Sequence, residues 1–243
     1  MKMKYEYKIN LKNKNSVAAI IYHAIEVNSN ILDVGCSIGK LGGFLKEDKQ
    51  CRVVGIDYDR ESLEIASQRV SKVGHIDLER DYYMGFTRLS HFLKEERFNY
   101  IILADVYEHL KNGKDILLKL SEYLSPGGVF FISVPNIIHH FARRKFLFGS
   151  FEYKRAGIFD ATHVRFFTPK SIKNEIESLD LSINTMTYVG KLFLVKNRIY
   201  RFLKFLVGGR NHYHDLEFFL GNHFPGLFAF QIVLKVGKRD ISH

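Results

Sequence analysis

The segment at residues 30–41, N-I-L-D-V-G-C-S-I-G-K-L, constrains the fold of this chain more than any other stretch. A short apolar run leads into a turn that contains Gly35 and Gly39, and an amphipathic stretch follows the turn. Parallel sheets are built from such strand–turn–helix units. The segment therefore predicts an α/β fold with a buried strand, a Gly-rich turn and a helix.

The same turn carries a carboxylate, Asp33, two residues before Gly35. A dinucleotide site of the G-x-G-x-x-G type presents backbone amides and a helix N-terminus to a pyrophosphate, which a carboxylate would repel. The spacing D-x-G-x-S-x-G instead suits a ligand that joins an adenosine to a cationic end. S-adenosylmethionine has both an ammonium and a sulfonium, so the turn points to a methyl donor.

Apolar runs alternate with amphipathic stretches along most of the chain, which is typical of repeated strand–helix units. Strands are predicted at about 30–35, 51–57, 71–76, 99–105, 128–134, 182–189 and 228–237. Helices are predicted at about 17–27, 40–48, 60–70, 84–96 and 113–124, and another opens at Thr168-Pro169. The expected fold is one domain over residues 1–243: a Rossmann-like, seven-stranded, mostly parallel sheet with helices on both faces.

Two stretches fall outside this alternation. The first, about 135–168, follows the fifth strand on the side where parallel sheets bind ligands, and we expect it to cover the substrate. Its basic and aromatic residues are expected to line the site: His139, His140, Arg143, Arg144, Lys145, Tyr153, Lys154 and Arg165. The second, about 191–226, is a helical insertion that either packs on the sheet or a second subunit, or lies on a membrane surface.

The net charge and the cysteine content indicate which partners and which cellular compartment to expect. The net charge of +10 favours an anionic partner such as a phosphorylated small molecule, nucleic acid or an acidic membrane surface. No apolar run reaches the ~20 residues that cross a bilayer, so a cytoplasmic protein is expected. Cys36 and Cys51 fall at opposite ends of neighbouring parallel strands, roughly 15 Å apart, which predicts free thiols.

Five pieces of sequence, in this order, resemble the class I S-adenosylmethionine-dependent methyltransferases. They are I-L-D-V-G-C-S-I-G-K-L-G from Ile31, V-V-G-I-D-Y-D from Val53, H-I-D-L-E from His75, F-N-Y-I-I-L-A-D-V-Y-E-H-L from Phe98 and L-S-P-G-G-V-F-F-I-S-V-P-N from Leu124. The chain looks closest to the branch with ubiquinone-pathway O-methyltransferases and methyltransferases of bacterial glycan gene clusters. A later piece, G-I-F-D-A-T-H-V-R-F-F-T from Gly157, resembles the glycan-cluster members. The resemblance implies O-methylation of a sugar-containing or other anionic acceptor.

Several residues are expected to bind the donor. Asp33 would anchor its ammonium, and Asp57, at the end of the second predicted strand, would accept both ribose hydroxyls. The family resemblance implies that Asp77, with the backbone of Leu78, binds the adenine amino group; Glu79 and Asp81 are alternatives. The complete predicted donor set is Asp33, Gly35, Cys36, Ser37, Gly39, Asp57, Tyr58, Asp77 and Leu78.

Asp105, Glu108 and His109 follow the fourth predicted strand, and His163 follows the cover. Methyl transfer needs an acceptor held in line and a group that removes its proton, which suits a histidine. We therefore expect His109 or His163 to be the general base, with Asp105 lining the site and Asp160 and Arg165 shaping the cover. His163 could approach the other three residues, and the four together could instead hold a divalent metal through two carboxylates and two imidazoles. The D-x-x-E-H pattern with a distant His resembles the E-x-x-E-H set of metal-dependent small-RNA terminal methyltransferases and some quinone O-methyltransferases, although the first Glu is here Asp105.

Three functions remain open on sequence alone. The first is the O-methyltransferase just described, acting on a glycan, nucleotide sugar or other small molecule without a metal. The second is metal-assisted methylation of an RNA terminus, which the basic charge also suits. The third is a non-catalytic subunit that binds the cofactor and serves a partner. A homodimer and a peripheral membrane contact are compatible with each.

Overall fold

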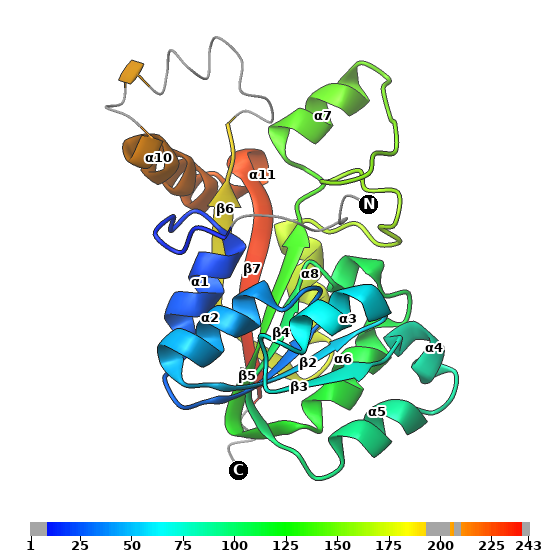
Figure 1. Ribbon diagram of the computed structural model, residues 1–243. Coiled ribbons are helices and arrows are strands. Elements are labelled where there is room, and N and C mark those ends of the chain that lie inside the picture. Colours follow the sequence, from blue (N-terminus) through cyan, green and yellow to red (C-terminus); the bar gives the residue numbers. More distant parts are fainter. Residues whose placement is uncertain (1–8, 193–204, 207–209, 240–243) are drawn as a thin grey trace.

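A single seven-stranded sheet forms the centre of the protein, which is described by a computed structural model over residues 9–192, 205–206 and 210–239 (Figure 1). The strands are β1 Asn30–Val34, β2 Arg52–Asp57, β3 Lys72–His75, β4 Phe98–Ala104, β5 Leu124–Pro135, β6 Leu181–Gly190 and β7 Ala229–Lys238. Their order across the sheet is β3-β2-β1-β4-β5-β7-β6. The strands from β3 to β5 pair in parallel, whereas β7 runs antiparallel to β5 and β6. The predicted fold class is confirmed.

Helices cover both faces of the sheet (Figure 1). The helices on one face are α1 Val17–Ala24, α2 Lys40–Lys49 and α3 Arg60–Ala66. Those on the other are α4 Leu78–Tyr82, α5 Thr87–Leu93, α6 Gly113–Ser121 and α8 Pro169–Glu177. Leu32 and Val34 belong to the apolar cluster on the second face, whereas Ile31 belongs to the cluster on the first. This alternation explains the unbroken apolar run of β1, because a parallel strand in such a sheet is buried on both sides.

The helix predicted at 84–96 is shorter in the structure, where α5 covers only Thr87–Leu93, and a separate helix that was not predicted, α4, precedes it. Gly85 and Phe86 between them have positive φ values of 67° and 58°, which no helix accommodates. The buried carboxylate of Asp81 accepts hydrogen bonds from the backbone N–H groups of Arg88 and Leu89, at 3.0 and 2.8 Å. Asp81 therefore caps α5 and fixes where this helix begins, later than predicted.

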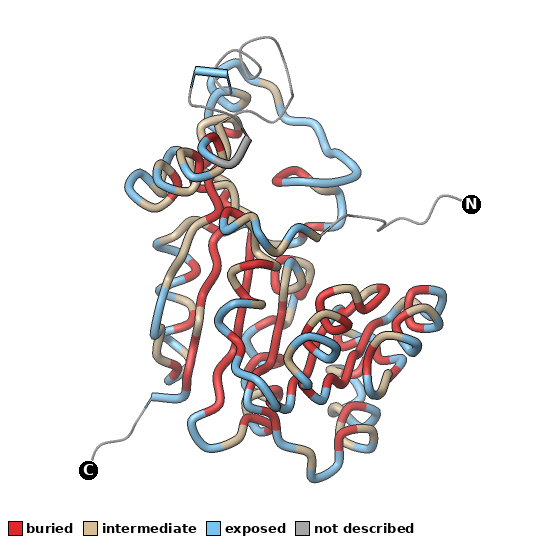
Figure 2. The backbone as a smooth tube through the Cα atoms, turned by 60° about the vertical axis from the view of Figure 1, so that its left-hand side comes forward, coloured by how far each residue is buried: buried red, intermediate tan, exposed pale blue. Residues whose placement is uncertain are grey.

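The cover segment at about 135–168 leaves the carboxyl end of β5 and contains α7 His140–Leu147 (Figure 1). Figure 2 shows buried residues concentrated in the strands, while the outer part of the cover is largely exposed. Inner residues of the cover, Ala142, Ile158 and Phe159, form a small apolar cluster of their own. The cover is thus an ordered structure above the strand ends.

The insertion predicted at 191–226 is described in part. Helix α10 Arg210–His223 packs on β6, and α11 Pro225–Phe228 leads into β7. The backbones touch so closely that a Cβ on Gly190 would lie 1.6 Å from the carbonyl oxygen of Glu217. The proposed membrane-surface stretch after Lys191 lies mostly outside the described residues. Across the ranges that are described, no helix is both long and apolar enough to cross a membrane.

Candidate active site

A cavity of about 750 Å³ opens at the carboxyl ends of the parallel strands. Its size is in the range of small-molecule sites. The turn after β1, the ends of β2 and β4, and the cover all contribute to its walls. The predicted site residues on its lining are Gly35, Ser37, Asp57, Tyr58, Asp77, Leu78, Asp105, His109 and His163. The topology therefore brings together most of the predicted donor and acceptor residues.

The turn after β1 depends on its glycines. Gly35 has a φ of 66°, and a Cβ there would lie 2.5 Å from Cγ2 of Val106, which follows β4. Gly39 is the N-cap of α2, and its φ of 70° lies in the left-handed region. Any side chain at residue 35 would thus be strained and would push the turn away from the end of β4.

Asp57 holds the turn against the end of β2. Its Oδ2 accepts a hydrogen bond from the backbone N–H of Ser37 at 2.8 Å, and its Oδ1 accepts one from the backbone N–H of Asp59 at 2.9 Å. The carboxylate is buried but lines the cavity, with the exposed ring of Tyr58 next to it. A carboxylate oxygen can accept more than one hydrogen bond, so these contacts leave acceptor capacity facing the cavity.

Three members of the predicted donor set, Asp33, Cys36 and Gly39, lie outside the cavity lining. Asp33 is buried beneath the turn, where desolvation, and secondarily the nearby Asp57, raise its pKa to about 7. Cys36 is a buried free thiol whose pKa is also raised by burial, and Cys51 is likewise free and buried. These residues support the turn from below.

Of the carboxylates predicted near the adenine, Asp77 and Glu79 line the cavity. Asp77 is the N-cap of α4 and accepts from the backbone N–H of Arg80 at 3.1 Å. The carboxylate of Glu79 accepts from both the backbone and the side chain of Asn112, at 3.0 and 3.2 Å. Asp81 is absent from the lining because it caps α5.

At the end of β4, Asp105 is held in place by two residues that the sequence analysis did not identify. Its Oδ1 accepts from the hydroxyl of Ser133 at 2.8 Å, and its two oxygens accept from Nε2 of Gln231 at 2.7 and 2.8 Å. Its backbone has a φ of 56°, a conformation that Asp tolerates better than most residues. Desolvation raises the pKa of Asp105, and the two donors oppose this shift. The carboxylate thus faces the cavity in a fixed orientation.

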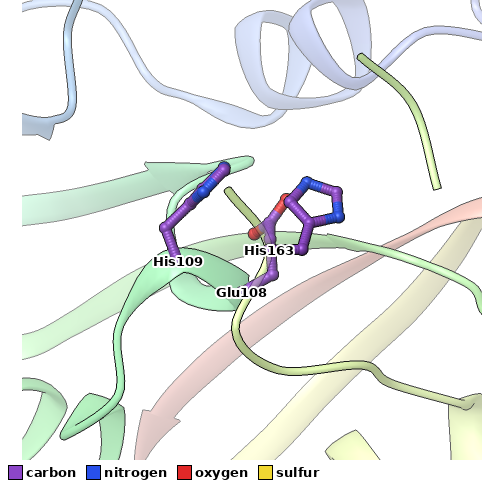
Figure 3. A group of neighbouring side chains, drawn as sticks. All are labelled: Glu108, His109 and His163. Atoms are coloured by element: carbon purple, nitrogen blue, oxygen red, sulfur yellow. The ribbon is translucent and has the colours of Figure 1, made fainter. Parts of the chain in front are cut away.

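Glu108, His109 and His163 form a compact group whose nitrogen and oxygen atoms lie within 4.8 Å of one another (Figure 3). Glu108 and His109 belong to the short 3₁₀-helix η1 Tyr107–His109, and His163 comes from the cover. The Nδ1–H of His109 donates to the carbonyl of Thr162 at 3.0 Å, and that of His163 donates to the carbonyl of Ile158 at 3.2 Å. Each neutral imidazole therefore keeps the lone pair of Nε2 free.

The carboxylate of Glu108 is 1% exposed, and neither oxygen has a hydrogen-bond partner among the described residues. Its Oε1 lies 3.8 Å from Nε2 of His163, which is too far for a hydrogen bond. Desolvation, followed by repulsion from Asp105, raises the pKa of Glu108 well above its usual range. Desolvation and the nearby His109 lower the pKa of His163, so this imidazole is neutral near pH 7.

The prediction of a basic lining is wrong, because none of the eight cover residues expected there belongs to the lining. His139 is buried, donates to the carbonyl of Lys191 at 2.8 Å, and has a pKa lowered to about 4 by burial. Arg143 donates to the carbonyls of Ile138 and Gly226, and Arg165 pairs with Glu175. These side chains hold the cover in place.

The described lining is acidic instead. It has one Lys or Arg, namely Arg155, and seven carboxylates: Asp57, Asp59, Asp77, Glu79, Asp105, Glu108 and Asp160. The carboxylate of Asp160 is held by the hydroxyl and backbone N–H of Thr162, at 2.6 and 2.8 Å. Such a cavity favours cationic or neutral groups over anions.

Comparisons with known proteins agree with this fold. A family model described as "Methyltransferase domain" matches residues 6–185. Ubiquinone biosynthesis O-methyltransferase of Rattus norvegicus is 30% identical over 64% of this chain and 45% of its own length. The enzyme of that name from Actinobacillus pleuropneumoniae serotype 5b is 31% identical over 44% of this chain and 45% of its own length. The matched region thus spans less than half of either relative.

Solved structures show the same fold at low identity. A SAM-dependent methyltransferase from Archaeoglobus fulgidus has a TM-score of 0.58 and 15% identity, with 94% of each chain covered. Coclaurine N-methyltransferase bound to N-methylheliamine and SAH has a TM-score of 0.56 and 16% identity, with 96% of this chain and 76% of that chain covered. With the family model covering most of the chain, this protein belongs to the methyltransferase domain family, within the class I S-adenosylmethionine-dependent methyltransferases.

Proposed function

We propose that this enzyme transfers the methyl group of S-adenosylmethionine to a hydroxyl group of a sugar-containing acceptor. The observation that carries the proposal is the two-sided cavity, with the Gly35 turn and Asp57 on one side and Asp105, His109 and His163 on the other. The first side fits an adenosine with a cationic end. The second side fits a neutral group that must lose a proton.

On the donor side, the acidic lining and the turn fit the cofactor. Gly35 lets the turn lie against Val106 at the end of β4, and Asp57 retains acceptor capacity for ribose hydroxyls. Asp77 and Leu78 line the place expected for the adenine. When bound, S-adenosylmethionine supplies an electrophilic methyl group on a cationic sulfur. The ionised form of Asp33, beneath the turn, would stabilise the cationic end electrostatically.

On the acceptor side, His109 or His163 removes the proton of the attacking hydroxyl. The carbonyls of Thr162 and Ile158 fix the tautomers, so that each Nε2 can accept a proton. Asp105 stabilises the imidazolium that forms, and its orientation is set by Ser133 and Gln231. Proton removal and in-line positioning are the contributions that methyl transfer needs from the protein.

The lining also limits which acceptors the cavity can bind. Seven carboxylates disfavour an anionic group deep in the cavity, so the reacting end is a neutral hydroxyl. An anionic group elsewhere on the acceptor would bind at the cover end, where Arg155 lines the cavity. A nucleotide sugar or a phosphate-linked glycan has this arrangement of a neutral sugar and a distal anion.

Methyl transfer from labelled S-adenosylmethionine to a panel of nucleotide sugars and phosphorylated glycans tests the proposal. The wild-type protein should label at least one sugar hydroxyl, and His109→Gln or His163→Gln should lower turnover by about 10²–10⁴-fold at unchanged donor affinity. His91→Gln, an exposed histidine of α5, is the matched control and should keep full activity. Donor binding without any methylated product would favour a non-catalytic partner subunit.

A second candidate, metal-assisted methylation, is favoured by the group Glu108, His109 and His163. Two imidazoles with free Nε2 atoms and a buried, unpartnered carboxylate are a suitable donor set for a divalent transition metal. The backbone carbonyls that orient both rings act as outer-shell partners commonly do in metal sites. Asp105 is not part of this group, because Ser133 and Gln231 hold it. A bound cation would neutralise Glu108 and polarise the acceptor hydroxyl.

Calorimetric titration of the free protein with Mn²⁺, Co²⁺, Ni²⁺ and Zn²⁺ distinguishes the two candidates. If methylation is metal-assisted, one metal ion should bind per chain, and Glu108→Gln should weaken metal binding by about 10–100-fold. Glu152→Gln, an exposed acid of the cover, should leave binding unchanged. If no metal binds and the protein keeps full activity in the presence of a chelator, the metal-free mechanism with a histidine base is favoured. If RNA is the substrate, its affinity for the protein should fall steeply as the salt concentration rises.

A further inference from the structure

The outer end of the cover exposes a group of large apolar side chains. Leu147 and Phe148, at the end of α7, are 79% and 77% exposed, and Tyr153 is 63% exposed. Phe146 and Phe151 are nearly half exposed, at 45% and 46%. Single exposed apolar residues are common, but a contiguous group on a protruding element marks an interaction surface. These five residues are here called the cover tip.

Ring packing orders the cover tip from below. The rings of Phe146 and Phe151 stack with centroids 6.0 Å apart, and both contact Phe159 edge-on, at 5.6 and 5.3 Å. Phe159 is only 2% exposed and belongs to the small apolar cluster of the cover. Tyr153 meets Phe151 at 5.1 Å. The rings of Phe146, Phe151 and Tyr153 are therefore already ordered, which lowers the entropic cost of docking this surface.

The segment that carries the cover tip is rich in basic residues. Residues 138–157 contain five Lys or Arg residues, Arg143, Arg144, Lys145, Lys154 and Arg155, against one acid, Glu152. Lys145 lies 3.9 Å from Glu152, and Arg143 is bound to backbone carbonyls. Arg144 and Lys154 have no ion-pair partner within the described part of the chain, although both lie over the ring of Phe141. The surface thus combines protruding apolar groups with cations.

We propose that the cover tip docks on the surface of an anionic phospholipid bilayer. Apolar side chains such as Leu147 and Phe148 can enter the boundary between headgroups and acyl chains, while cations of the same segment contact lipid phosphates. A second copy of the chain fits less well, because a self-complementary contact would bring two basic surfaces together. Nucleic acid fits less well because Leu147, the most exposed apolar residue of the tip, offers no ring on which a base can stack.

Docking there would bring the cavity close to the membrane. Arg155, Ala156 and Gly157 line the cavity and follow Tyr153 of the cover tip directly in the chain. An acceptor attached to a lipid phosphate could thus present its sugar to the cavity while its lipid stays in the bilayer. The lipid binding itself does not depend on the acceptor proposed above, so either proposal can fail alone.

Vesicle cosedimentation of the full chain tests this inference. Wild-type protein should bind vesicles of phosphatidylcholine mixed with phosphatidylglycerol and bind vesicles of phosphatidylcholine alone much more weakly. The double variant Leu147→Ser/Phe148→Ser should bind the anionic vesicles at least about tenfold more weakly. Arg144→Gln/Lys154→Gln should lose about fivefold per charge on anionic vesicles only. Val27→Ser/Leu118→Ser, which alters exposed apolar residues away from the cover, is the matched control and should bind like wild type.

All variants alter exposed positions, and unchanged circular dichroism and donor affinity would verify that they fold. The proposal would be overturned if the wild type ignored anionic vesicles, or if the tip variant bound them as tightly as wild type. The second outcome would place the lipid contact elsewhere in the chain. A wild-type dimer that the tip variant abolishes, measured by sedimentation velocity, would assign the surface to a second copy instead.

Discussion

At the residue scale, the buried carboxylate of Asp33 couples the donor turn to pH. Its pKa in the folded protein is raised to about 7, chiefly by desolvation. Between about pH 4 and pH 7 the folded protein therefore holds a proton that the unfolded chain has lost, so the free energy of unfolding falls as pH rises over this range. Asp33→Asn cannot ionise and should escape this fall.

Urea unfolding of the donor-free protein at about pH 4.5 and pH 8 measures this effect. Relative to Asp33→Asn, wild type should lose about 3 kcal/mol of stability between the two conditions. Asp48→Asn, which alters an exposed aspartate whose carboxylate accepts a hydrogen bond from the Tyr22 hydroxyl, is the matched control. Parallel pH dependences for wild type and Asp33→Asn would mean that Asp33 ionises normally.

Gly35 is the residue at which the turn is most sensitive to a side chain. Gly35→Ala would place a Cβ 2.5 Å from Cγ2 of Val106 and would hold alanine at a φ of 66°. We expect a loss of about 2–4 kcal/mol in the free energy of unfolding, together with weaker donor binding. Gly127→Ala has a similar φ of 72° but no atom within 4 Å, so it should cost only about 1 kcal/mol. Equal losses of stability in the two variants would show that the contact with Val106 does not cause the effect at Gly35.

At the element scale, the antiparallel strand β7 serves the active site through Gln231. The predicted strand was correct, but nothing in its sequence indicates that Gln231 reaches Asp105, which lies 126 residues earlier in the chain. Gln231→Leu removes a hydrogen bond that lowers the pKa of Asp105. We expect turnover to fall about tenfold and the acid limb of the pH–rate profile to move to higher pH.

Matched kinetics of Gln231→Leu and Gln231→Glu check this positioning role. The Glu variant keeps the length of the side chain but adds a like charge beside Asp105, so it should shift the pH profile further in the same direction. Unchanged profiles in both variants, with normal folding, would show that Asp105 does not depend on Gln231.

The strands were predictable because apolar runs of strand-forming residues, bounded by turn-forming residues, are local features of the sequence. The helix predicted at 84–96 begins only at Thr87, because its start depends on Asp81, whose carboxylate accepts from the backbone of Arg88 and Leu89. Both α4 and α5 bury apolar residues against the same sheet face. A periodic pattern alone could not reveal where α5 begins or that α4 precedes it.

At the scale of the whole molecule, the two sides of the cavity differ in how far the sequence predicts them. The proposed donor side is built from the ends of neighbouring parallel strands, so motifs that follow each strand converge there, as Gly35 and Asp57 do. The acceptor side depends on the cover, whose path no local pattern specifies. The sequence suggested that His163 approaches His109, and their ring centroids lie 4.8 Å apart. It wrongly placed the basic cover residues in the cavity.

Charge is segregated across the molecule. The net charge of +10 suggested an anionic ligand, yet the described cavity lining is acidic, and Arg144 and Lys154 of the cover, which have no ion-pair partner among the described residues, lie outside this lining. The total charge is therefore informative about the outer surface of the cover rather than about the reacting group. This separation fits an acceptor with a neutral hydroxyl at one end and a phosphate at the other.

Calorimetric titration of S-adenosylmethionine into wild type and Asp57→Ala tests the proposed donor site. Asp57 faces the donor side of the cavity and also holds the turn through Ser37 and Asp59. Wild type should bind one molecule per chain, and Asp57→Ala should remain folded but bind at least about tenfold more weakly. Equal affinity in the two proteins, or no binding by wild type, would contradict the donor site described for this cavity.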